Sequence, residues 1–213
     1  MTQPDLPEIL REASLEEAER LLEAGEEIAG CRFFGESLPE MPGVLCEFTG
    51  CYFEKCTFVP CGAARLAFVD CVFEKCDFSG MVFPKSTFQR TRFVHCRMTG
   101  AQFQENVLMH TTFRECQMDY ANFSIVKAQH VEYTDCALKE SVFYQVKWTD
   151  WKLVRCNLAQ AELSDTPLKG LDVTSCDLAG LRVDIRGLRG LKVTPGQAVQ
   201  LSALLGLDIQ EPS

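Results

Sequence analysis

Twelve cysteines are the residues of this 213-residue sequence with the most obvious capacity for chemistry. Thiolates bind zinc, form disulfides and take part in redox reactions. All twelve are separated by multiples of five residues. Seven of them follow one another at steps of twenty: Cys56, Cys76, Cys96, Cys116, Cys136, Cys156 and Cys176. Such regularity indicates a structural repeat, which has to be interpreted before any thiol chemistry.

The repeat has a period of five residues. Every fifth residue from Phe48 to Val193 gives thirty positions, and twenty-eight of them hold Phe, Met, Leu, Tyr, Trp or Val. The exceptions are Ala63 and Ala128, where we expect bulges or compensating large neighbours. A period of five fits neither the 3.6 of a helix nor the alternation of a strand. It predicts a solenoid in which each pentapeptide forms one side and sends two side chains inward, and the step of twenty predicts four sides per coil.

The predicted solenoid places the seven spaced cysteines in one internal column. Successive coils would lie about 4.8 Å apart, the strand spacing of a sheet. Zinc requires ligands at tetrahedral corners, and disulfides require Cβ atoms about 3.8 Å apart. A redox or zinc function is the alternative, but we interpret this cysteine ladder as a row of small hydrophobic side chains. We expect no metal and no cofactor.

Two histidines, His110 and His130, would lie one above the other on the outside of the solenoid. A metal site is one interpretation, but two imidazoles without a carboxylate or thiolate are too few for zinc. Two solvated histidines is the interpretation we favour. The sequence contains no catalytic motif, and a filled solenoid has no concave apolar pocket. We therefore expect a protein that is not an enzyme.

Composition indicates a soluble globular protein, since 46% of the residues are hydrophobic and 24% are charged. No apolar run approaches the roughly 18 residues of a membrane span, and the N-terminus does not resemble a signal peptide. We expect a cytoplasmic protein with no membrane association.

Three segments follow from these patterns. Residues 1–45 form an acidic cap and connector, residues 46–193 the repeat, and residues 194–213 a C-terminal helix and short strand. Within the first segment, helical spacing predicts a helix over residues 5–29, with Ser14 and Glu17 as a capping pair. That helix is interpreted as a cap, and a detached partner-binding helix is the alternative.

The C-terminal segment changes period. Thr194 is the expected N-cap of a helix that has Pro195 at its first position and Gln197 completing a capping box. Gly206 is the expected stop, and residues 207–209 alternate as a short strand would. A two-turn helix this apolar is not stable alone. It must cover the last coil, meet a second copy of itself, or both.

Charge is unevenly distributed along the sequence. Residues 1–40 carry a net charge of −8 and the remaining 173 residues a net charge of −1. One side of the solenoid would be acidic through Asp77, Asp119, Glu140 and Asp177, and this side is a candidate surface for a partner. Another side would display Arg90, Lys127, Lys147, Lys169 and Arg189 against Glu47, Asp70 and Asp150. Its cations are sparse, and a pI near 4.9 argues against direct nucleic-acid binding.

Pentapeptides such as CTFVP, CDFSG, AQFQE, ANFSI and CNLAQ resemble those of the pentapeptide-repeat family. The resemblance extends from Cys46 to about Val193. It implies an all-β solenoid, the right-handed quadrilateral β-helix of pentapeptide repeats. It says little about function, because the repeat defines the core.

The C-terminal sequence LRVDIRGLRGLKVTPGQAVQLSALLGLDI is similar to the tails of Qnr-type quinolone-resistance proteins. That resemblance implies a two-fold dimer, and it implies a DNA mimic that binds DNA gyrase or topoisomerase IV and protects the enzyme from inhibitors such as quinolones. The plasmid-borne members also carry loops between coils, which this sequence lacks. A rigid scaffold or adaptor for an unrelated partner is the alternative. The implied dimer contacts are Ala198, Leu201, Leu204, Leu205, Leu207 and Ile209.

Overall fold

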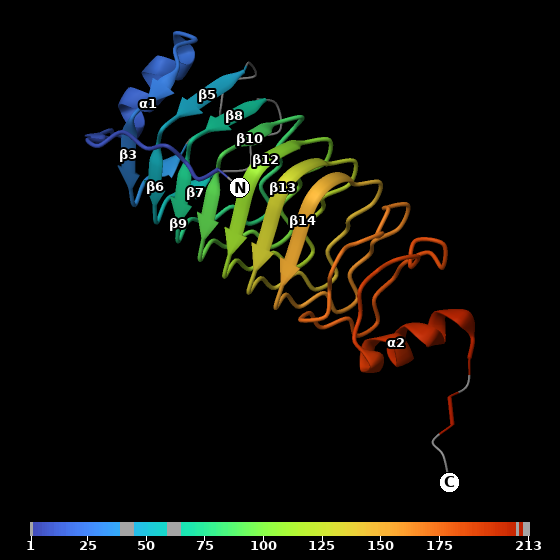
Figure 1. Ribbon diagram of the computed structural model, residues 1–213. Coiled ribbons are helices and arrows are strands. Elements are labelled where there is room, and N and C mark those ends of the chain that lie inside the picture. The colour runs from blue at the N-terminus through green and yellow to red at the C-terminus, as the bar shows by residue number, and fades with distance from the viewer. Residues whose placement is uncertain (1, 39–44, 59–64, 208, 211–213) are drawn as a thin grey trace.

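The computed structural model describes residues 2–38, 45–58, 65–207 and 209–210. The chain forms a rod of stacked coils with a helix at each end (Figure 1). Residues twenty apart are paired in parallel, as in Phe53 with Phe73 and Phe73 with Phe93. The fold class expected from the sequence, a right-handed quadrilateral β-helix of pentapeptide repeats, is confirmed.

The four sides of the coil are called A to D in chain order. Side A is centred on Phe48 and every twentieth residue after it, side B on Phe53, side C on Phe58 and side D on Phe83. Sides A and B are extended strands, and from β12 onward single strands run around the corner from A to B. Sides C and D are joined mostly by single bridges, such as Asp77 to Arg97.

The N-terminal elements are β1 (Arg11–Glu12), α1 (Leu15–Glu23), β2 (Ile28–Ala29), β3 (Cys31–Phe34) and β4 (Ser37–Leu38). The coils continue with β5 (Cys46–Thr49), β6 (Tyr52–Glu54), β7 (Thr57–Phe58), β8 (Leu66–Val69), β9 (Val72–Glu74), β10 (Thr87–Gln89), β11 (Arg92–Val94), β12 (Val107–Arg114), β13 (Lys127–Thr134) and β14 (Lys147–Val154). The C-terminal elements are α2 (Pro195–Ser202) and the short 3-10 helix η1 (Ala203–Leu205).

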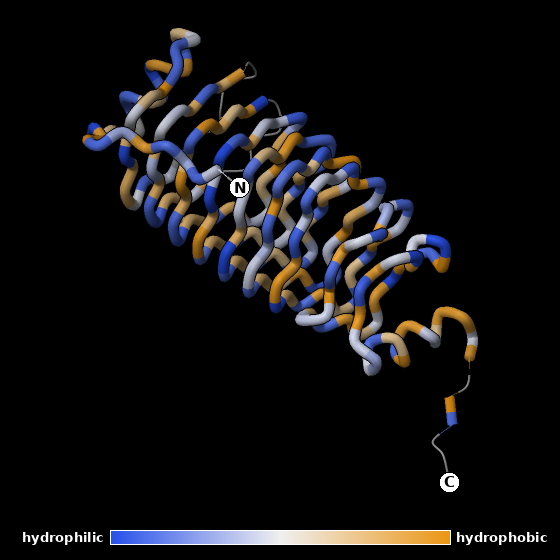
Figure 2. The backbone as a smooth tube through the Cα atoms, in the orientation of Figure 1, coloured by the Kyte–Doolittle hydropathy of each residue, from blue (hydrophilic) through white to orange (hydrophobic). Residues whose placement is uncertain are grey.

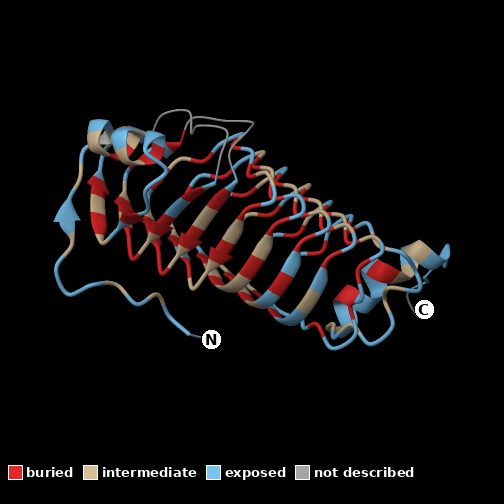
Figure 3. Cartoon of the chain, turned by 90° about the horizontal axis from the view of Figure 1, so that it is seen from above, coloured by how far each residue is buried: buried red, intermediate tan, exposed pale blue. Residues whose placement is uncertain are grey.

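Stacked rings fill the interior. On side B the ring centroids of Phe73 and Phe93 lie 4.7 Å apart, and those of Phe93 and Phe113 lie 4.9 Å apart, with planes within 10°. The centroid spacing is about the distance between strands in a sheet, so each ring packs on the ring of the next coil. Hydrophobic and hydrophilic residues alternate along the coils (Figure 2), and buried residues recur regularly from coil to coil (Figure 3).

The corners of the coil require an unusual backbone. Nineteen non-glycine residues of the described chain have a positive φ between 48° and 61°, and all have numbers ending in 0 or 5. The left-handed conformation costs an L-residue about 1–2 kcal/mol, so it is rare outside glycine, asparagine and aspartate. It persists here because stacked coils hold the corner on both sides. Lys55 N–H, for example, donates to the carbonyl of Glu74 in the next coil.

The N-terminal helix is shorter than the sequence predicts. The prediction of a helix over residues 5–29 is wrong, because α1 is limited to Leu15–Glu23. Ser14 caps it by accepting a hydrogen bond from the Glu17 backbone, as expected. On either side the chain forms strands instead: β1 pairs with β3, and β2 pairs with β5. The parallel ladder therefore begins at Arg11, upstream of the expected start at Cys46.

The C-terminal helix begins as the sequence predicts. Thr194 and Gln197 form the capping box, Pro195 opens α2, and Gly206 takes a left-handed φ of 68° after η1. The buried Gln197 side chain also donates hydrogen bonds of 2.8 Å to the carbonyls of Val173 and Cys176. These bonds dock the helix on the last coil. Residues 207 and 209 belong to no strand, and Asp208 lies outside the described residues.

Large neighbours compensate for the small residue at Ala128, which is only 6% exposed. Trp148 is its registered partner in the next coil, and the Trp148 ring lies 6.0 Å from that of Trp151. The indole N–H of Trp148 reaches the Pro167 carbonyl at 2.6 Å. The other exception, Ala63, lies outside the described residues.

Ile125 is the corner at which we expect backbone strain to be measurable, because a β-branched side chain at a φ of 59° is a steric outlier. Its side chain is 49% exposed and so contributes little packing. Replacement by asparagine, Ile125→Asn, should raise the free energy of unfolding by about 1 kcal/mol. For a chain of this size that corresponds to a rise in Tm of roughly 2–4 °C, measurable by thermal denaturation. Ile125→Val keeps the branch and should leave Tm unchanged; a lower Tm for Ile125→Asn would show that this corner is unstrained.

Candidate interaction surfaces

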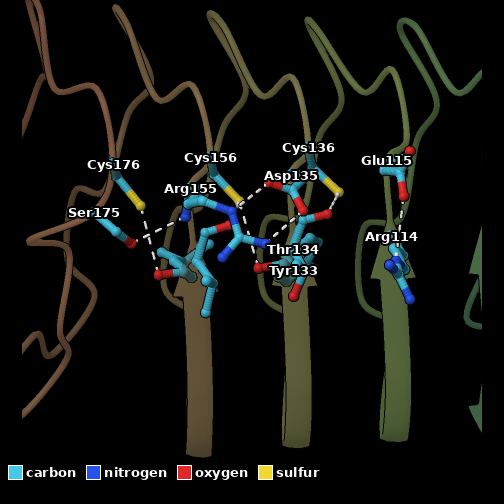
Figure 4. Close-up of polar contacts among 12 residues, drawn as sticks. Arg114, Glu115, Tyr133, Thr134, Asp135, Cys136, Arg155, Cys156, Ser175 and Cys176 are labelled. Carbon is cyan, nitrogen blue, oxygen red and sulfur yellow. Dashed lines mark hydrogen bonds and ion pairs between the residues drawn. The ribbon is translucent and has the colours of Figure 1, made fainter.

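The cysteine ladder lies inside the rod. Its seven members are buried thiols at the corner between sides B and C, with exposed fractions of 8% or less. Cys136 Sγ lies 3.4 Å from the carbonyl oxygens of both Thr134 and Phe113, and Cys156 Sγ lies 3.5 Å from that of Tyr133. The sulfur atoms thus point at backbone acceptors rather than at solvent (Figure 4).

Burial raises the pKa of Cys96 in the ladder, which makes this thiol a poor nucleophile. Within the described ranges, no group of three or more His, Cys, Asp or Glu residues is arranged to hold a metal ion. The interior therefore serves packing, and the surfaces available for recognition are the four outer sides and the two ends.

Charged residues on the outside pair with a residue of opposite sign twenty positions away. Arg155 contacts Asp135 through two bonds of 2.6 Å, as Figure 4 shows. The other pairs are Glu12 with Arg32, Asp70 with Arg90, Asp77 with Arg97, Lys85 with Glu105, His95 with Glu115 and His130 with Asp150. Because residues twenty apart stack on successive coils, each of these charged side chains lies beside one of opposite sign on the next coil.

The corner between sides A and B carries a continuous polar column. Arg90 donates two hydrogen bonds of 2.6 Å to Asp70. Farther along, the rings of His110 and His130 stack at 4.6 Å, and His130 Nδ1 lies 2.9 Å from Asp150. The predicted stack of the two histidines is present. The Asp150 carboxylate and the Arg90 guanidinium, which adjoin the stack in this column, are not predicted from the sequence as its neighbours. The signal that could have found them is the sign alternation at a step of twenty.

An N-terminal arm, residues 2–10, lies along this corner instead of extending a helix (Figures 1 and 3). The backbone N–H of Asp5 donates to Asp70 at 3.0 Å, and that of Thr2 donates to His110 Nδ1 at 3.3 Å. A Cβ on Gly50 would lie 3.1 Å from the Pro7 ring, so the lack of a side chain there lets the arm pass closely. The arm thus ties the N-terminal coils to the middle of the rod.

The four acidic residues singled out from the sequence all lie on side C, and each contacts a group of its own chain. Asp77 accepts hydrogen bonds from Ser79 and pairs with Arg97 at 3.1 Å. The remaining contacts are Asp119 with the Lys139 backbone N–H, Glu140 with the Tyr120 hydroxyl and Lys139, and Asp177 with the Ala179 backbone N–H. Each of these carboxylates therefore already contacts a backbone N–H, a hydroxyl or a cation of its own chain, which reduces the negative charge that side C presents.

The predicted dimer residues are divided between the core and the surface. Leu201 is buried against the last coil, and Leu204 packs partly against it. Exposed apolar side chains remain beside them: Val199 at 53%, Leu205 at 53%, Leu207 at 58% and Ile209 at 51%. Ala198 is exposed as well. The helix covers the last coil, and it presents an apolar row to solvent.

An open cleft of about 800 Å³ lies between the last coils and η1, bordered by Asp165, Asp184, Ile185 and Leu204 among others. It forms where the coil ends irregularly, since the Asp165 N–H bonds to the side chain of Asp184. Ile185 is 55% exposed there. The cleft thus adds to the apolar end surface. Neither helix of the described chain has the length and apolarity needed to cross a membrane.

Comparison with known proteins places these features among repeat proteins. Residues 45–123 match a family model described as a pentapeptide repeat region. Two solved structures of trypsin-treated variants of QnrB1, a plasmid-mediated fluoroquinolone resistance protein, are similar to the chain. One is 24% identical, covering 86% of this chain and 100% of that chain with a TM-score of 0.45. The other is 23% identical, covering 97% and 99% with a TM-score of 0.48.

A third structure is that of HetL, a pentapeptide repeat protein involved in heterocyst differentiation regulation from the cyanobacterium Nostoc. It is 13% identical, with 82% of this chain and 96% of that chain covered and a TM-score of 0.38. Likeness at this level carries no argument about function. No protein with a curated description matches the sequence.

Acid should weaken the docking of the arm through His110. Burial, together with His130, the N-terminal amine and Arg90, lowers the pKa of His110 below its usual 6.5. The unfolded chain therefore binds this proton more readily than the folded chain. The corresponding contribution to stability is complete above about pH 6.5 and is lost as the pH falls through the lowered pKa. Protonation also removes the acceptor for the Thr2 N–H.

The measurement is Tm at about pH 8 and about pH 5.5 for the wild type and for His110→Gln. The decrease in Tm on acidification should be smaller in the variant. His95→Gln, on a different corner, is the matched control and should keep the wild-type decrease. An identical pH dependence in wild type and His110→Gln would contradict this role.

Proposed function

We propose that this chain, of which residues 45–123 match a pentapeptide-repeat family model, is a non-enzymatic protein that binds a type II DNA topoisomerase, DNA gyrase, through its outer surface. It modulates the engagement of the enzyme with DNA or protects it from an inhibitor such as a quinolone. The observation that carries this proposal is the C-terminal element. Its sequence resembles the tails of Qnr-type proteins, and it folds as a capped helix docked on the last coil by Gln197.

The same element supports a homodimer. The exposed row of Val199, Leu205, Leu207 and Ile209 lies next to the cleft that contains Ile185. A cluster of apolar side chains at one tip of a rod is typical of an association surface. Two copies joined at this tip would form one longer rod with a two-fold axis at its centre.

The proposed partner surface is side C, which carries Asp77, Asp119, Glu140 and Asp177 on different coils. Carboxylates distributed along one side are the feature that a DNA mimic would need. Topoisomerase IV is the related enzyme to which the same surface would apply. Direct nucleic-acid binding by this side is not part of the proposal, because its carboxylates would repel phosphate.

A second candidate function is a rigid adaptor for an unrelated protein partner. The observation that favours it is the contrast between side C, whose four carboxylates contact their own chain, and α1, whose Glu16, Glu19 and Glu23 form no ion pair within the described chain. In that case the acidic helix is the docking element. The proposed location of either activity is the cytoplasm.

A supercoiling assay with DNA gyrase separates the two functions. Micromolar wild-type protein should change the rate of supercoiling or reduce the effect of a quinolone. Asp119→Asn with Glu140→Gln should weaken that effect, because it removes charge from the middle of side C. Glu132→Gln with Glu162→Gln makes the same charge change on sides B and D and is the control. If wild-type protein affects neither supercoiling nor inhibitor sensitivity, the adaptor is favoured.

The dimer is tested at Leu205, whose side chain is 53% exposed, so that its replacement should not disturb the coil. Leu205→Asp should convert the dimer to monomers, as measured by multi-angle light scattering. Gln200→Asp introduces the same charge on α2 without removing an apolar contact, and it should remain dimeric. A monomeric wild type, or a dimeric Leu205→Asp, would overturn this assignment.

A further inference from the structure

The C-terminal half of side A stacks cations on cations, in contrast to the outer columns in which opposite charges pair. Lys127 and Lys147 are exposed and are registered neighbours at the starts of β13 and β14. Lys169 and Arg189, twenty residues apart on the same side, again carry like charge and are exposed. Like charges directly opposite each other destabilise a sheet. Folding alone therefore gives no reason for this arrangement.

These residues together with Arg186 are called the side A cation row. Lys169, Arg186 and Arg189 border a cavity of about 390 Å³ whose lining contains no carboxylate. Among the ion pairs of the described chain, none involves a member of the row. Four successive coils therefore each supply a cation that the rod does not neutralise.

Helix α1 carries the complementary charge. Glu16, Glu19 and Glu23 follow the spacing i, i+3 and i+7, which places them on one stripe of the helix. The other face of α1 packs on the first coils through the buried Ala18 and Leu22. Glu23 also lies in the last turn, where the helix dipole makes a negative charge unfavourable. Glu16 and Glu23 of this stripe are exposed and Glu19 is half-buried, and none of the three forms an ion pair within the described chain.

The spacing of the two sets of charges agrees. The rise of about 1.5 Å per residue separates the three glutamates by about 4.5 and 6 Å along the helix. Coil stacking separates the cations by about 4.8 Å per coil along the rod. A helix laid parallel to the rod axis would therefore bring its three carboxylates close to cations of successive coils. Lys127 and Lys147 lie one residue before the centre of side A, and Lys169 and Arg189 lie one residue after it.

We propose that the side A cation row binds helix α1 of a second copy of this chain. The helix cannot reach the row of its own rod, because α1 lies at one end and β13, β14 and α2 lie toward the other (Figure 1). The contact joins two different surfaces, so it does not close on itself. It generates staggered chains of rods whose length increases with concentration and decreases with salt. This contact is separate from the C-terminal dimer and from any enzyme partner.

Nucleic acid is the competing occupant, and the structure favours it less. Duplex DNA carries one negative charge per about 1.7 Å, far denser than one cation per coil. The protein also has a net charge of −9, which repels a long polyanion. An acidic helix carries only a few negative charges, at a spacing close to that of the cations. It therefore brings less negative charge against this acidic protein than a nucleic acid would.

Sedimentation velocity of the full chain at about 20 mM and about 500 mM NaCl tests the contact, since the Debye length falls from roughly 20 Å to roughly 4 Å over this range. The average mass at low salt should exceed that at high salt and should increase with protein concentration. Lys127→Glu with Lys147→Glu should weaken the association about tenfold or more, as should Glu19→Lys with Glu23→Lys. A hydrophobic C-terminal dimer would persist at high salt, so the average mass measured at high salt is the reference for the salt-dependent association.

Mixing the two double variants gives the decisive result. Each alone lacks one surface, but the intact helix of the first fits the intact cation row of the second, so the mixture should regain the low-salt association. Lys152→Glu with Lys192→Glu makes the same charge change on side B and should behave as wild type. A wild-type mass independent of salt, or no recovery on mixing, would overturn the proposal. So would tight binding of a DNA oligonucleotide by the row without any self-association.

Discussion

The stacking of each residue on the residue twenty positions later is the constraint on which the whole molecule depends. It holds because most corner residues, at every fifth position, take a left-handed conformation and the backbone N–H at such a corner bonds to the next coil. One inserted residue would shift every later ring and thiol away from its column. The rings of Phe93, Phe113 and Tyr133, stacked at 4.7–4.9 Å, show how closely the register is kept.

This constraint also organises the outside of the rod. Since outward residues stack as strictly as inward ones, each outer column becomes a row of regularly spaced charges. Most columns neutralise themselves, as Asp135 and Arg155 do, and such columns stabilise the rod without offering a charged surface. A column that fails to neutralise itself, such as the one containing Lys127 and Lys147, is therefore informative about recognition.

The two ends show how an extended core is closed. A solenoid leaves an apolar coil bare at each tip, and a polar cap is required for solubility. At the N-terminal tip, α1 packs through Ala18 and Leu22 and turns its glutamates outward. At the C-terminal tip, α2 satisfies backbone carbonyls through Gln197 yet leaves Leu205 and Leu207 exposed. The rod therefore has one polar end and one apolar end, and the two ends are not equivalent.

The sequence by itself determined the period, the four sides and the buried position of the cysteine ladder, because each is a local pattern repeated at a fixed step. It also determined the capping box at Thr194 and Gln197, which involves residues three apart. Only the tertiary structure decided the course of the N-terminal arm. The helical spacing of residues 5–29 was overridden beyond α1 by contacts with distant residues, such as Asp5 with Asp70 and Ile28 with Phe48. Such contacts leave no local pattern, since the free energy that favours them comes from surfaces that exist only once the coils have stacked.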